Sequence, residues 1–453
     1  MKKRLSKEEH LKEQAQKISI KEGSAYSVMD GFGLRYITPY ALTLGASNTH
    51  IGILNSLPNL VGSLSELYAI KWMNRISRQK LVFWTVLLQA IMWLGVIGIG
   101  AFFFLFNIDH TIAPIALIIV YTLLTIFGTA PVPAWSSWMK DIVPAHYNEY
   151  FGIRNRIAGF VALVCMLIAG YLLDLLKVIH IFLGFAVLFV IAFMGRALSA
   201  YLFLKQYEPK FVPDHHHLPV WQFVKRLSEN SFGKFTLFVS TMNLVVAIAA
   251  PFFAVYMLDH LKFSYVQFTI VLLSSAIIML LVMPAWGKFA DLYGNLKITK
   301  ITGMLIPTIP LLWLAAPYFV NNNPSMLVPY LIAVEAFSGL VWAGFNLATS
   351  DFVYDVASPQ KIPSFVTYFT ILSNLGLFIG ALIGGFISSL PFTFIGLPSI
   401  LVIFLLSGIL RFAVAGIMLP RLKEAKRVKR FGLKEAEKQF LHLSFGRVIR
   451  ILR

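Results

Sequence analysis

The sequence predicts an all-α polytopic membrane protein with twelve transmembrane helices in two pseudo-symmetric six-helix halves. Three observations support this fold class. Hydrophobic residues make up 58% of the 453 residues, charged residues only 13%, and the mean hydropathy is +0.73, which is outside the range of soluble domains. Apolar segments of about 20 residues, the length that crosses a bilayer, recur along the whole chain. Features of the first half of the chain also reappear about 215 residues later.

The hydropathy pattern gives twelve predicted spans. They cover roughly 24–45, 50–70, 80–105, 112–134, 155–174, 179–204, 234–257, 265–286, 298–318, 325–347, 364–390 and 396–420. The first span has the weakest signal, because Asp30 and Arg35 interrupt it. The count and the regular spacing of the segments, more than any single segment, predict the architecture.

The internal repeat divides the chain into domains. Three pairs of residues are separated by 215 positions (for example 411 − 196): Pro144 and Pro359, Gly170 and Gly385, and Arg196 and Arg411. Repeated halves are typical of secondary transporters, which hold their substrate near mid-membrane between the halves. The expected organisation is a cytoplasmic N-terminal tail (1–23), a first six-helix bundle (24–204), a cytoplasmic central loop (205–233), a second six-helix bundle (234–420) and a basic cytoplasmic C-terminal tail (421–453).

The basic residues predict the orientation. Loops on one side of the predicted spans and both tails hold nearly all of the loop Lys and Arg residues, whereas the opposite loops hold only Lys177 and Lys262. Such an asymmetry places both termini in the cytoplasm, and we expect a multi-pass protein of the cytoplasmic (inner) membrane of a bacterium. The formal net charge of +18 is explained by this topology. A nucleic-acid partner is not expected, because no basic cluster lies on a separate folded domain.

The sequence offers little sign of an enzyme, a metal site or a cofactor. The segment 62–65 contains serines, but no histidine lies in mid-span, and Tyr354-Asp355 lacks the second element of an intramembrane aspartyl protease. Phosphate-binding glycine loops and zinc motifs are absent from the sequence. The run His215–His217 favours a solvated linker over a metal site, because three adjacent histidines cannot easily all face one metal ion. The tail 421–453 fits either an amphipathic helix on an anionic membrane surface or a disordered segment.

Loop motifs make the architecture more specific. After the eighth span the chain has Gly287, Asp291, Gly294 and a basic end at Lys297, and this pattern resembles the cytoplasmic loop signature of the major facilitator superfamily. A degraded copy between spans 2 and 3 has Asn74 in place of the aspartate. Glycine permits a tight turn, and a carboxylate is stabilised at the N-terminus of a neighbouring helix.

The resemblance implies that this loop acts as a clasp on the cytoplasmic face, with Asp291 against the start of span 11. The clasp of the first half is then expected to be weaker, because Asn74 is uncharged. The cytoplasmic gate residues that follow from this reading are Asn74, Arg75, Arg78, Asp141, Gly287, Asp291, Gly294 and Asp355.

Further segments resemble a bacterial branch of the same superfamily whose members mostly have unassigned substrates. They are 133–144 with 150–156, 251–257 and 344–349, so that the resemblance extends over roughly residues 25–420. It implies a major facilitator fold but no particular substrate. The Gly-Pro pair of the superfamily's drug antiporters is missing from span 5, which ends in Ile168-Ala-Gly170-Tyr. This absence disfavours drug or metabolite efflux by proton antiport but does not exclude it, so efflux stays as an alternative, as does a non-transporting receptor or scaffold.

Charged residues inside the predicted spans indicate the mechanism. Each costs about 2.5–3.5 kcal/mol at mid-membrane unless it faces protein or water, so Glu335 in span 10 requires an explanation. One helical stripe carries Glu335, Ser338, Gly339, Trp342 and Asn346. Span 10 lines the central cavity in the superfamily, and Glu335 is a candidate to carry a coupling proton. The alternative is that Glu335 pairs with an arginine and only joins helices.

Asp30 and Arg35 form the second group of charges. Five residues correspond to about 140° of helical rotation, so the two side chains are not expected to share a face or to pair. Asn243 in span 7 is the repeat equivalent of Asp30 at an offset of 213, and Tyr256 in the same span can stack on a solute. The predicted substrate and coupling cavity thus contains Glu335, Asp30, Arg35, Asn243, Tyr256, Trp342 and Asn346.

Two sets of residues have predicted structural roles. Arg196 and Arg411 lie on spans that pack outside the cavity and are expected to cap carboxylates such as Glu66. Small residues in span 11, Gly376, Gly380 and Gly384, predict a groove for close helix packing.

The expected function is secondary transport of a small organic solute by alternating access. We expect proton coupling, with sodium as the alternative ion, and a monomer in the lipid bilayer.

Overall fold

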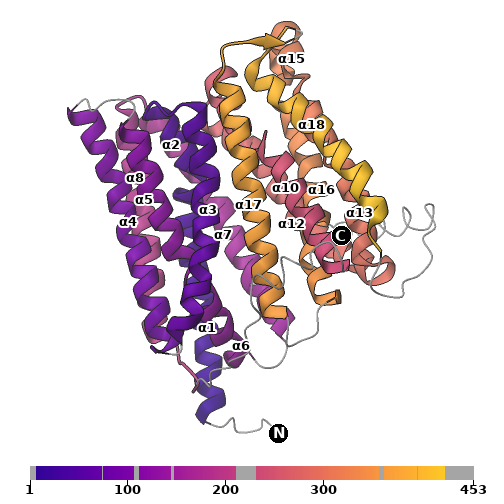
Figure 1. Ribbon diagram of the computed structural model, residues 1–453. Coiled ribbons are helices and arrows are strands. Elements are labelled where there is room, and N and C mark those ends of the chain that lie inside the picture. The colour runs from indigo at the N-terminus through magenta and orange to yellow at the C-terminus, as the bar shows by residue number, and fades with distance from the viewer. Residues whose placement is uncertain are drawn as a thin grey trace, which may run out of the picture. The chain divides into compact units, whose positions relative to one another are not determined.

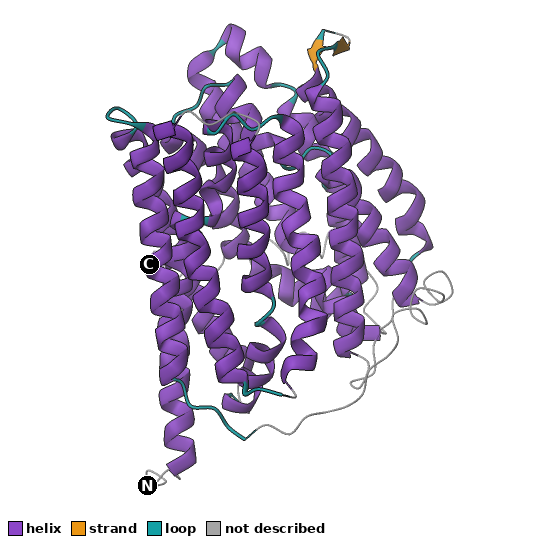
Figure 2. Cartoon of the chain, turned by 60° about the vertical axis from the view of Figure 1, so that its left-hand side comes forward, coloured by secondary structure: helices purple, strands orange, loops and turns teal. Residues whose placement is uncertain are grey.

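The structure is a computed structural model that describes residues 7–73, 75–106, 112–143, 147–210, 231–356, 362–394 and 396–423. These residues are almost entirely helical (Figure 2). The exception in the described chain is a short antiparallel pair of strands, β1 (Thr393–Phe394) and β2 (Leu397–Pro398). The predicted all-α class is therefore confirmed.

The chain forms two compact units. The first contains Met1–His215 together with Ala254–Thr269, and the second contains His216–Phe253 together with Ile270–Arg453. The segment Ala254–Thr269 thus packs with the first unit although the chain on both sides of it belongs to the second. This short segment is separated in sequence from the rest of its unit, so its place in the first unit depends on tertiary contacts, which include hydrogen bonds to Asp174 and Tyr36.

Eight of the described α-helices lie wholly within the first unit. They are α1 (Lys7–Phe32), α2 (Ile37–Thr43), α3 (Asn48–Met73), α4 (Arg78–Phe106), α5 (Ile112–Thr129), α6 (Val132–Ile142), α7 (Tyr147–Leu176) and α8 (Ile181–Lys205). Helix α1 packs against α7 and α8, α4 packs against α5 and α8, and α3 packs against α5 (Figure 1). A 3-10 turn, Leu34–Tyr36, separates α1 from α2.

The segment that joins the first unit from outside contains a π-helical turn. Helix α11 (Phe252–Val255) leads into the π-helix Tyr256–His260, and α12 (Tyr265–Tyr293) begins shortly afterwards. Only the first turn of α12, up to Thr269, belongs to the first unit.

The second unit contains the remaining helices. They are α10 (Ser231–Ala247), the rest of α12, α13 (Asn295–Leu305), α14 (Thr308–Trp313), α15 (Ala316–Asn322), α16 (Leu327–Val356), α17 (Ile362–Ser389) and α18 (Ser399–Met418), with 3-10 turns at Pro324–Met326 and Leu419–Arg421. Helix α10 packs against α17 and α18, and α13 packs against α16.

Two local predictions of backbone packing are confirmed in this unit. Gly294 has φ +86° and separates α12 from α13, as expected for the tight turn in the loop motif. A Cβ at Gly376 or Gly380 would overlap a backbone carbonyl of α10, and a Cβ at Gly384 would overlap the carbonyl of Ile248, directly after the end of α10. The small residues of α17 therefore form the predicted groove, into which α10 packs.

Ten segments of the described chain are long and apolar enough to cross a membrane. They are Arg78–Phe106, Ile112–Ile142, Tyr150–Leu176, Ile181–Lys205, Phe232–His260, Tyr265–Tyr293, Asn295–Asn322, Pro324–Phe352, Tyr368–Ser389 and Ser399–Arg421. These ten match ten of the predicted spans and confirm a polytopic membrane protein. The predicted spans at 24–45 and 50–70 form α1, α2 and α3 and are outside this set, so the total of twelve remains a prediction.

Candidate solute and coupling site

Asp30 and Arg35 form an ion pair in the first unit. The Arg35 guanidinium donates from Nη2 at 3.3 Å and from Nε at 3.4 Å to Oδ2 of Asp30. The prediction that these side chains do not pair was wrong. It assumed one continuous helix, but α1 ends at Phe32 and the chain continues through Gly33 into a 3-10 turn. The helical rotation of 100° per residue does not hold across this break.

The ion pair is open on the side of Arg35. The Arg35 side chain is 56% exposed and the Asp30 side chain 18% exposed. Two aromatic residues, Tyr26 of α1 and Tyr121 of α5, lie close enough to both charges to interact with them electrostatically. Charge, hydroxyl groups and aromatic rings are thus combined in a small region of the first unit, which is a composition suited to binding an organic solute.

Glu335 of α16 has an aromatic partner. Its Oε1 accepts a hydrogen bond from Nε1 of Trp313 at 3.3 Å, and this bond connects α16 to α14. The Trp313 ring is fully buried and packs against Phe253 and Phe404. No Lys or Arg side chain among the residues that the structure describes forms an ion pair with Glu335. Within the described part of the chain, the partner of Glu335 is therefore an indole, and the predicted alternative of pairing with an arginine is not observed there.

The residues of the stripe that begins at Glu335 differ in how deeply they are buried. Ser338 and Gly339 are buried, and Gly339 packs against the backbone of Ser275 in α12. Trp342 is half-buried, and Asn346 is exposed. Glu335 and Asn346 therefore do not lie in one uniform environment, even though they share a helical face.

The other predicted cavity residues lie in different units. Asn243 is half-buried on α10 in the second unit, whereas Tyr256 is buried at the start of the π-helix in the first unit. The shared cavity that the sequence predicts for Asp30, Asn243 and Tyr256 remains a prediction.

Arg78 of the predicted gate is a fully buried anchor within the first unit. Its Nη1 donates to Oδ2 of Asp141 at 2.6 Å, and its Nη2 donates to the carbonyl oxygen of Pro209 at 3.0 Å. The backbone N–H of Arg78 donates to Oε1 of Glu208 at 2.8 Å. Two predicted gate residues, Arg78 and Asp141, are thereby brought together, and they hold the chain that leaves α8.

The remaining gate residues do not form a contact network in the described chain. Asp291 is exposed and has neither a hydrogen-bond nor an ion-pair partner among the described residues, and Arg75 is also exposed. Gly287 lies inside α12 with open space around its Cα. Asn74 and the side chain of Asp355 lie outside the described residues, as do His215–His217 and the tail from 424 onward. The clasp stays a prediction.

A buried carboxylate that the sequence analysis did not single out organises the first unit. Glu22 of α1 is 3% exposed and accepts from Nη2 of Arg154 at 2.9 Å and from Oγ of Ser199 at 2.8 Å. Arg196 lies 3.8 Å from the same carboxylate. Arg196 thus lies beside a carboxylate, as its predicted structural role requires, but this carboxylate belongs to Glu22 and not to Glu66, the example that the sequence suggested.

A sequence signal for Glu22 does exist. The small residues Ala15, Ser19 and Gly23 lie on the same helical face as Glu22, and all four are buried. A stripe of small residues indicates a packed helix face, and α1 runs without interruption from the predicted tail into the first predicted span.

The sequence comparisons agree with the fold. A model of the Major Facilitator Superfamily matches residues 23–354 and 231–451. The MFS-type transporter MJ1560 of Methanocaldococcus jannaschii is 26% identical over 383 residues, which cover 79% of this chain and 88% of that protein.

Solved structures share the fold at low sequence identity. A crystal structure of a mutant of the nucleoside transporter NupG has a TM-score of 0.67 with 14% identity and covers 91% of this chain and 100% of that one. A bacterial homologue of the human lysosomal transporter Spinster has a TM-score of 0.61 with 16% identity and 96% and 98% coverage. A bacterial homologue of the iron transporter ferroportin has a TM-score of 0.65 with 11% identity and 90% and 98% coverage. The helical membrane fold and the match over most of its length show that this chain belongs to the Major Facilitator Superfamily.

Proposed function

We propose that this protein is a proton-coupled secondary transporter that moves a small organic solute across the cytoplasmic membrane by alternating access. Membership of a transporter family supports the class of function. In this proposal both termini face the cytoplasm, and the two units change their relative positions to expose the solute to either side in turn.

The observation that carries the proposal is the open ion pair between Asp30 and Arg35. A charged pair in a membrane segment is costly unless it faces protein or water, and Arg35 is more than half exposed. Protonation of Asp30 removes the counter-charge of Arg35, whose guanidinium is then free to hold an electronegative group of a solute. Binding of solute and binding of a proton are linked in this way through a single pair of side chains.

Glu335 is the second carboxyl group in the proposal. It shares a hydrogen bond with Trp313, and its protonation would change the acceptor strength of Oε1 toward that indole. Since Asn346 on the same helix is exposed, α16 supplies a surface for the solute, with Trp342 as a ring to stack on; Asn243 of α10 in the same unit is a further hydrogen-bonding group.

The test is proton movement driven by solute in proteoliposomes. The panel contains sugars, amino acids, organic acids, amphiphilic cations and nucleosides, the last because NupG is a nucleoside transporter. We expect one class to move protons with wild-type protein. Asp30→Asn is expected to retain exchange of labelled solute while proton movement falls at least about tenfold, because the amide does not titrate.

The matched control is Glu13→Gln, an exposed carboxylate near the start of α1 that is expected to behave as wild type. If Glu335→Gln loses proton movement and Asp30→Asn does not, the coupling group is Glu335. If both variants couple normally, proton coupling through these residues is refuted. Proton movement with amphiphilic cations alone, directed against the cation, would identify efflux by antiport. Folded protein that moves nothing in the panel would contradict transport and support a receptor or scaffold.

A further inference from the structure

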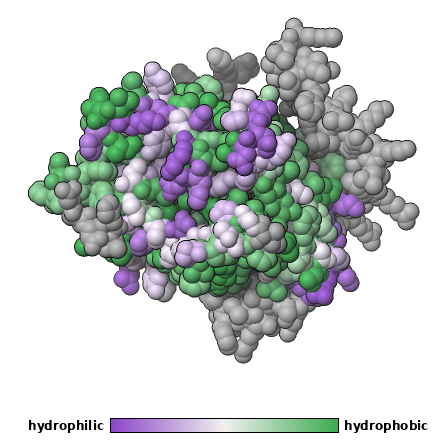
Figure 3. Space-filling model, turned by 90° about the horizontal axis from the view of Figure 1, so that it is seen from above, coloured by the Kyte–Doolittle hydropathy of each residue, from purple (hydrophilic) through white to green (hydrophobic). Residues whose placement is uncertain are grey.

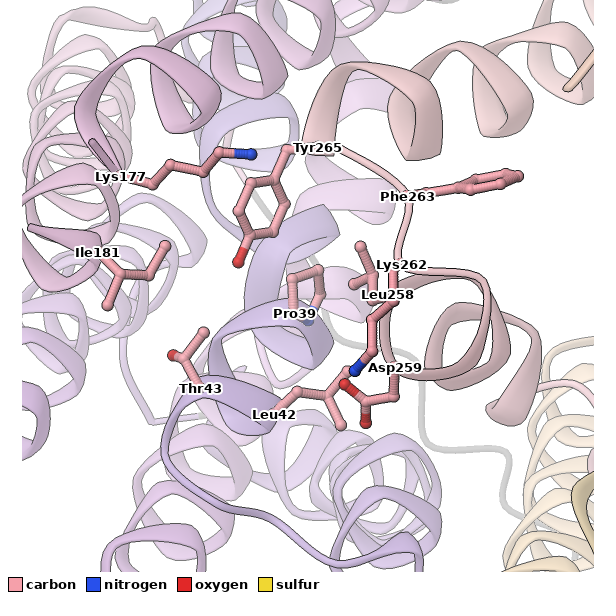
Figure 4. Close-up of a pocket in the computed structure, with 10 residues that line it drawn as sticks. All are labelled: Pro39, Leu42, Thr43, Lys177, Ile181, Leu258, Asp259, Lys262, Phe263 and Tyr265. Atoms are coloured by element: carbon pink, nitrogen blue, oxygen red, sulfur yellow. The ribbon is translucent and has the colours of Figure 1, made fainter. Parts of the chain in front are cut away.

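A cavity lies within the first unit, at the end where α2 meets the α7–α8 connection and the segment Ala254–Thr269. Its volume is about 330 Å³, at the lower end of the range of small-molecule sites. It is lined by Pro39, Leu42, Thr43, Lys177, Ile181, Leu258, Asp259, Lys262, Phe263 and Tyr265 (Figure 4). In the space-filling view of the molecule from above, hydrophilic residues interrupt an otherwise largely apolar surface (Figure 3).

The two lysines that line this cavity have a special place in the sequence. Lys177 and Lys262 are the only Lys or Arg residues that the sequence places in the loops on this side of the predicted spans. In a protein whose basic residues are otherwise concentrated on the opposite side, the convergence of both exceptions on one cavity indicates a use for positive charge there.

The backbone at Lys262 supports a functional interpretation. Its φ of +54° is the only positive φ of a non-glycine residue in the described chain. This left-handed conformation costs an L-residue about 1–2 kcal/mol relative to the right-handed helical region. Such backbone strain is concentrated at binding and active sites, where a side chain must be placed at a defined point.

Each lysine has an acidic residue near it: Asp174 pairs with Lys177, and Asp259 interacts electrostatically with Lys262. Asp174 lies just outside the lining, and its oxygens accept from the backbone N–H groups of Tyr265 at 3.1 Å and Val266 at 2.7 Å and from Nζ of Lys177 at 2.5 Å. It therefore caps the N-terminus of α12. Asp259 is exposed and forms no ion pair within 4.0 Å among the described residues. The lining itself has two cations and one anion.

We propose that this cavity binds a small organic anion. Lys262 and Lys177 hold its carboxylate or phosphate group, and the ring of Tyr265, which points toward the other lining residues (Figure 4), covers its apolar part together with the aliphatic lining. Lys177 can take part while it is bonded to Asp174, because an ammonium group has three donors and this side chain is 39% exposed. The site is independent of the coupling role proposed for Asp30, and a binding measurement tests it without transport.

The experiment measures thermal unfolding in nanodiscs made only of phosphatidylcholine. The probes are benzoate, which is an anion with an apolar ring, and benzylamine, which carries a positive charge on the same ring. We expect benzoate to raise the unfolding midpoint in a saturable way and benzylamine to have no such effect. Lys262→Gln is expected to raise the apparent dissociation constant for benzoate about tenfold, since a charge-assisted hydrogen bond is lost.

Two further variants separate this effect from damage to the fold. Asp259→Asn removes the competing negative charge and is expected to lower the dissociation constant about twofold to threefold, which structural damage would not do. Lys140→Gln, at an exposed lysine of α6, serves as the matched control and is expected to bind as wild type.

A second arm identifies the source of the anion. If benzoate has no effect, but replacing part of the phosphatidylcholine by phosphatidylglycerol stabilises wild type and not Lys262→Gln, the occupant is an anionic lipid headgroup. The proposal is overturned if neither benzoate nor phosphatidylglycerol stabilises the protein, or if Lys262→Gln responds to both as wild type does.

Discussion

Two arginines at equivalent positions of the repeat are stabilised in different ways. Arg196 and Arg411 are both buried, at 4% and 1% exposure. Arg196 donates from Nε to Oε1 of Gln89 at 2.6 Å and lies beside the Glu22 carboxylate. Arg411 instead donates to the carbonyl oxygens of Ile306 at 3.4 Å and Val246 at 3.2 Å, and it forms no ion pair with a carboxylate in the described chain.

The partners of these arginines are themselves related by the repeat. Gln89 and Ile306 are 217 positions apart (306 − 89), which is also the offset between the two loop motifs. The same place in each half therefore supports the arginine, once with a side-chain amide and once with a main-chain carbonyl. The repeat has therefore kept the geometry of the arginine site but not its charge balance. The first unit has an ionic core around Glu22, whereas Arg411 of the second unit is held by carbonyl dipoles.

The largest expected effect of this difference is on Glu22. Replacing it by glutamine leaves the buried Arg196 and the partly buried Arg154 without this counter-charge, and breaking a buried pair costs about 3–5 kcal/mol. The free energy of unfolding, measured in mixed dodecyl sulfate micelles, should fall by that amount. Glu8→Gln on the same helix is the control, because its carboxylate is 60% exposed. An effect below about 1 kcal/mol would contradict the ionic core.

A smaller effect is expected at the loops. Arg78 and Asn295 are equivalent at an offset of 217 (295 − 78), and Arg78 forms ion pairs with Asp141 of α6 and with Glu208 in the chain after α8. Arg78→Met should lower the free energy of unfolding by about 1.5–3 kcal/mol, the range for charge-assisted hydrogen bonds. Asn295→Ala is the comparison variant, and we expect it to lower the free energy of unfolding by less than Arg78→Met does. Equal losses for both variants would remove this second asymmetry.

The smallest effect is expected at Arg411. Arg411→Met removes a buried cation and leaves no carboxylate of the described chain without its partner. The free-energy cost of desolvating the guanidinium disappears with it, and this offsets most of the lost hydrogen bonds. We expect a change in the free energy of unfolding of about 1 kcal/mol or less. The same measurement on Arg196→Met should show a clearly larger loss. If Arg411→Met were as damaging as Glu22→Gln, the distinction between charges and dipoles would not hold.

The membrane fold was predictable because hydropathy, repeat offset and loop motif depend on composition and order along the chain. The glycine groove of α17 and the turn at Gly294 were predictable for the same reason, since small residues act through the backbone. Helical periodicity predicts faces only as long as a helix continues. The pairing of Asp30 with Arg35 was missed because α1 ends between them at Phe32.

Partners that come from distant parts of the chain were the least predictable. Glu22 is 132 residues from Arg154 and 174 from Arg196 (154 − 22 and 196 − 22), and no local pattern specifies that they meet. Glu335 was identified correctly as a charge that needs a partner, but the partner is the indole of Trp313 instead of a basic side chain. Hydropathy identifies which charges are unusual, and only three-dimensional packing determines what satisfies them.

The segment Ala254–Thr269 has a consequence for attempts to take the molecule apart. It is covalently part of the C-terminal portion of the chain but packs with the first unit, where Asp174 caps its helix and Tyr36 donates to or accepts from Thr269. An N-terminal fragment ending in the loop 205–233 would lack these sixteen residues (269 − 253) and would leave Asp174 without its two amide donors. Two co-expressed fragments would therefore associate when the C-terminal fragment supplies this segment to the N-terminal one. This resembles donor-strand complementation, with a helix terminus in place of a strand.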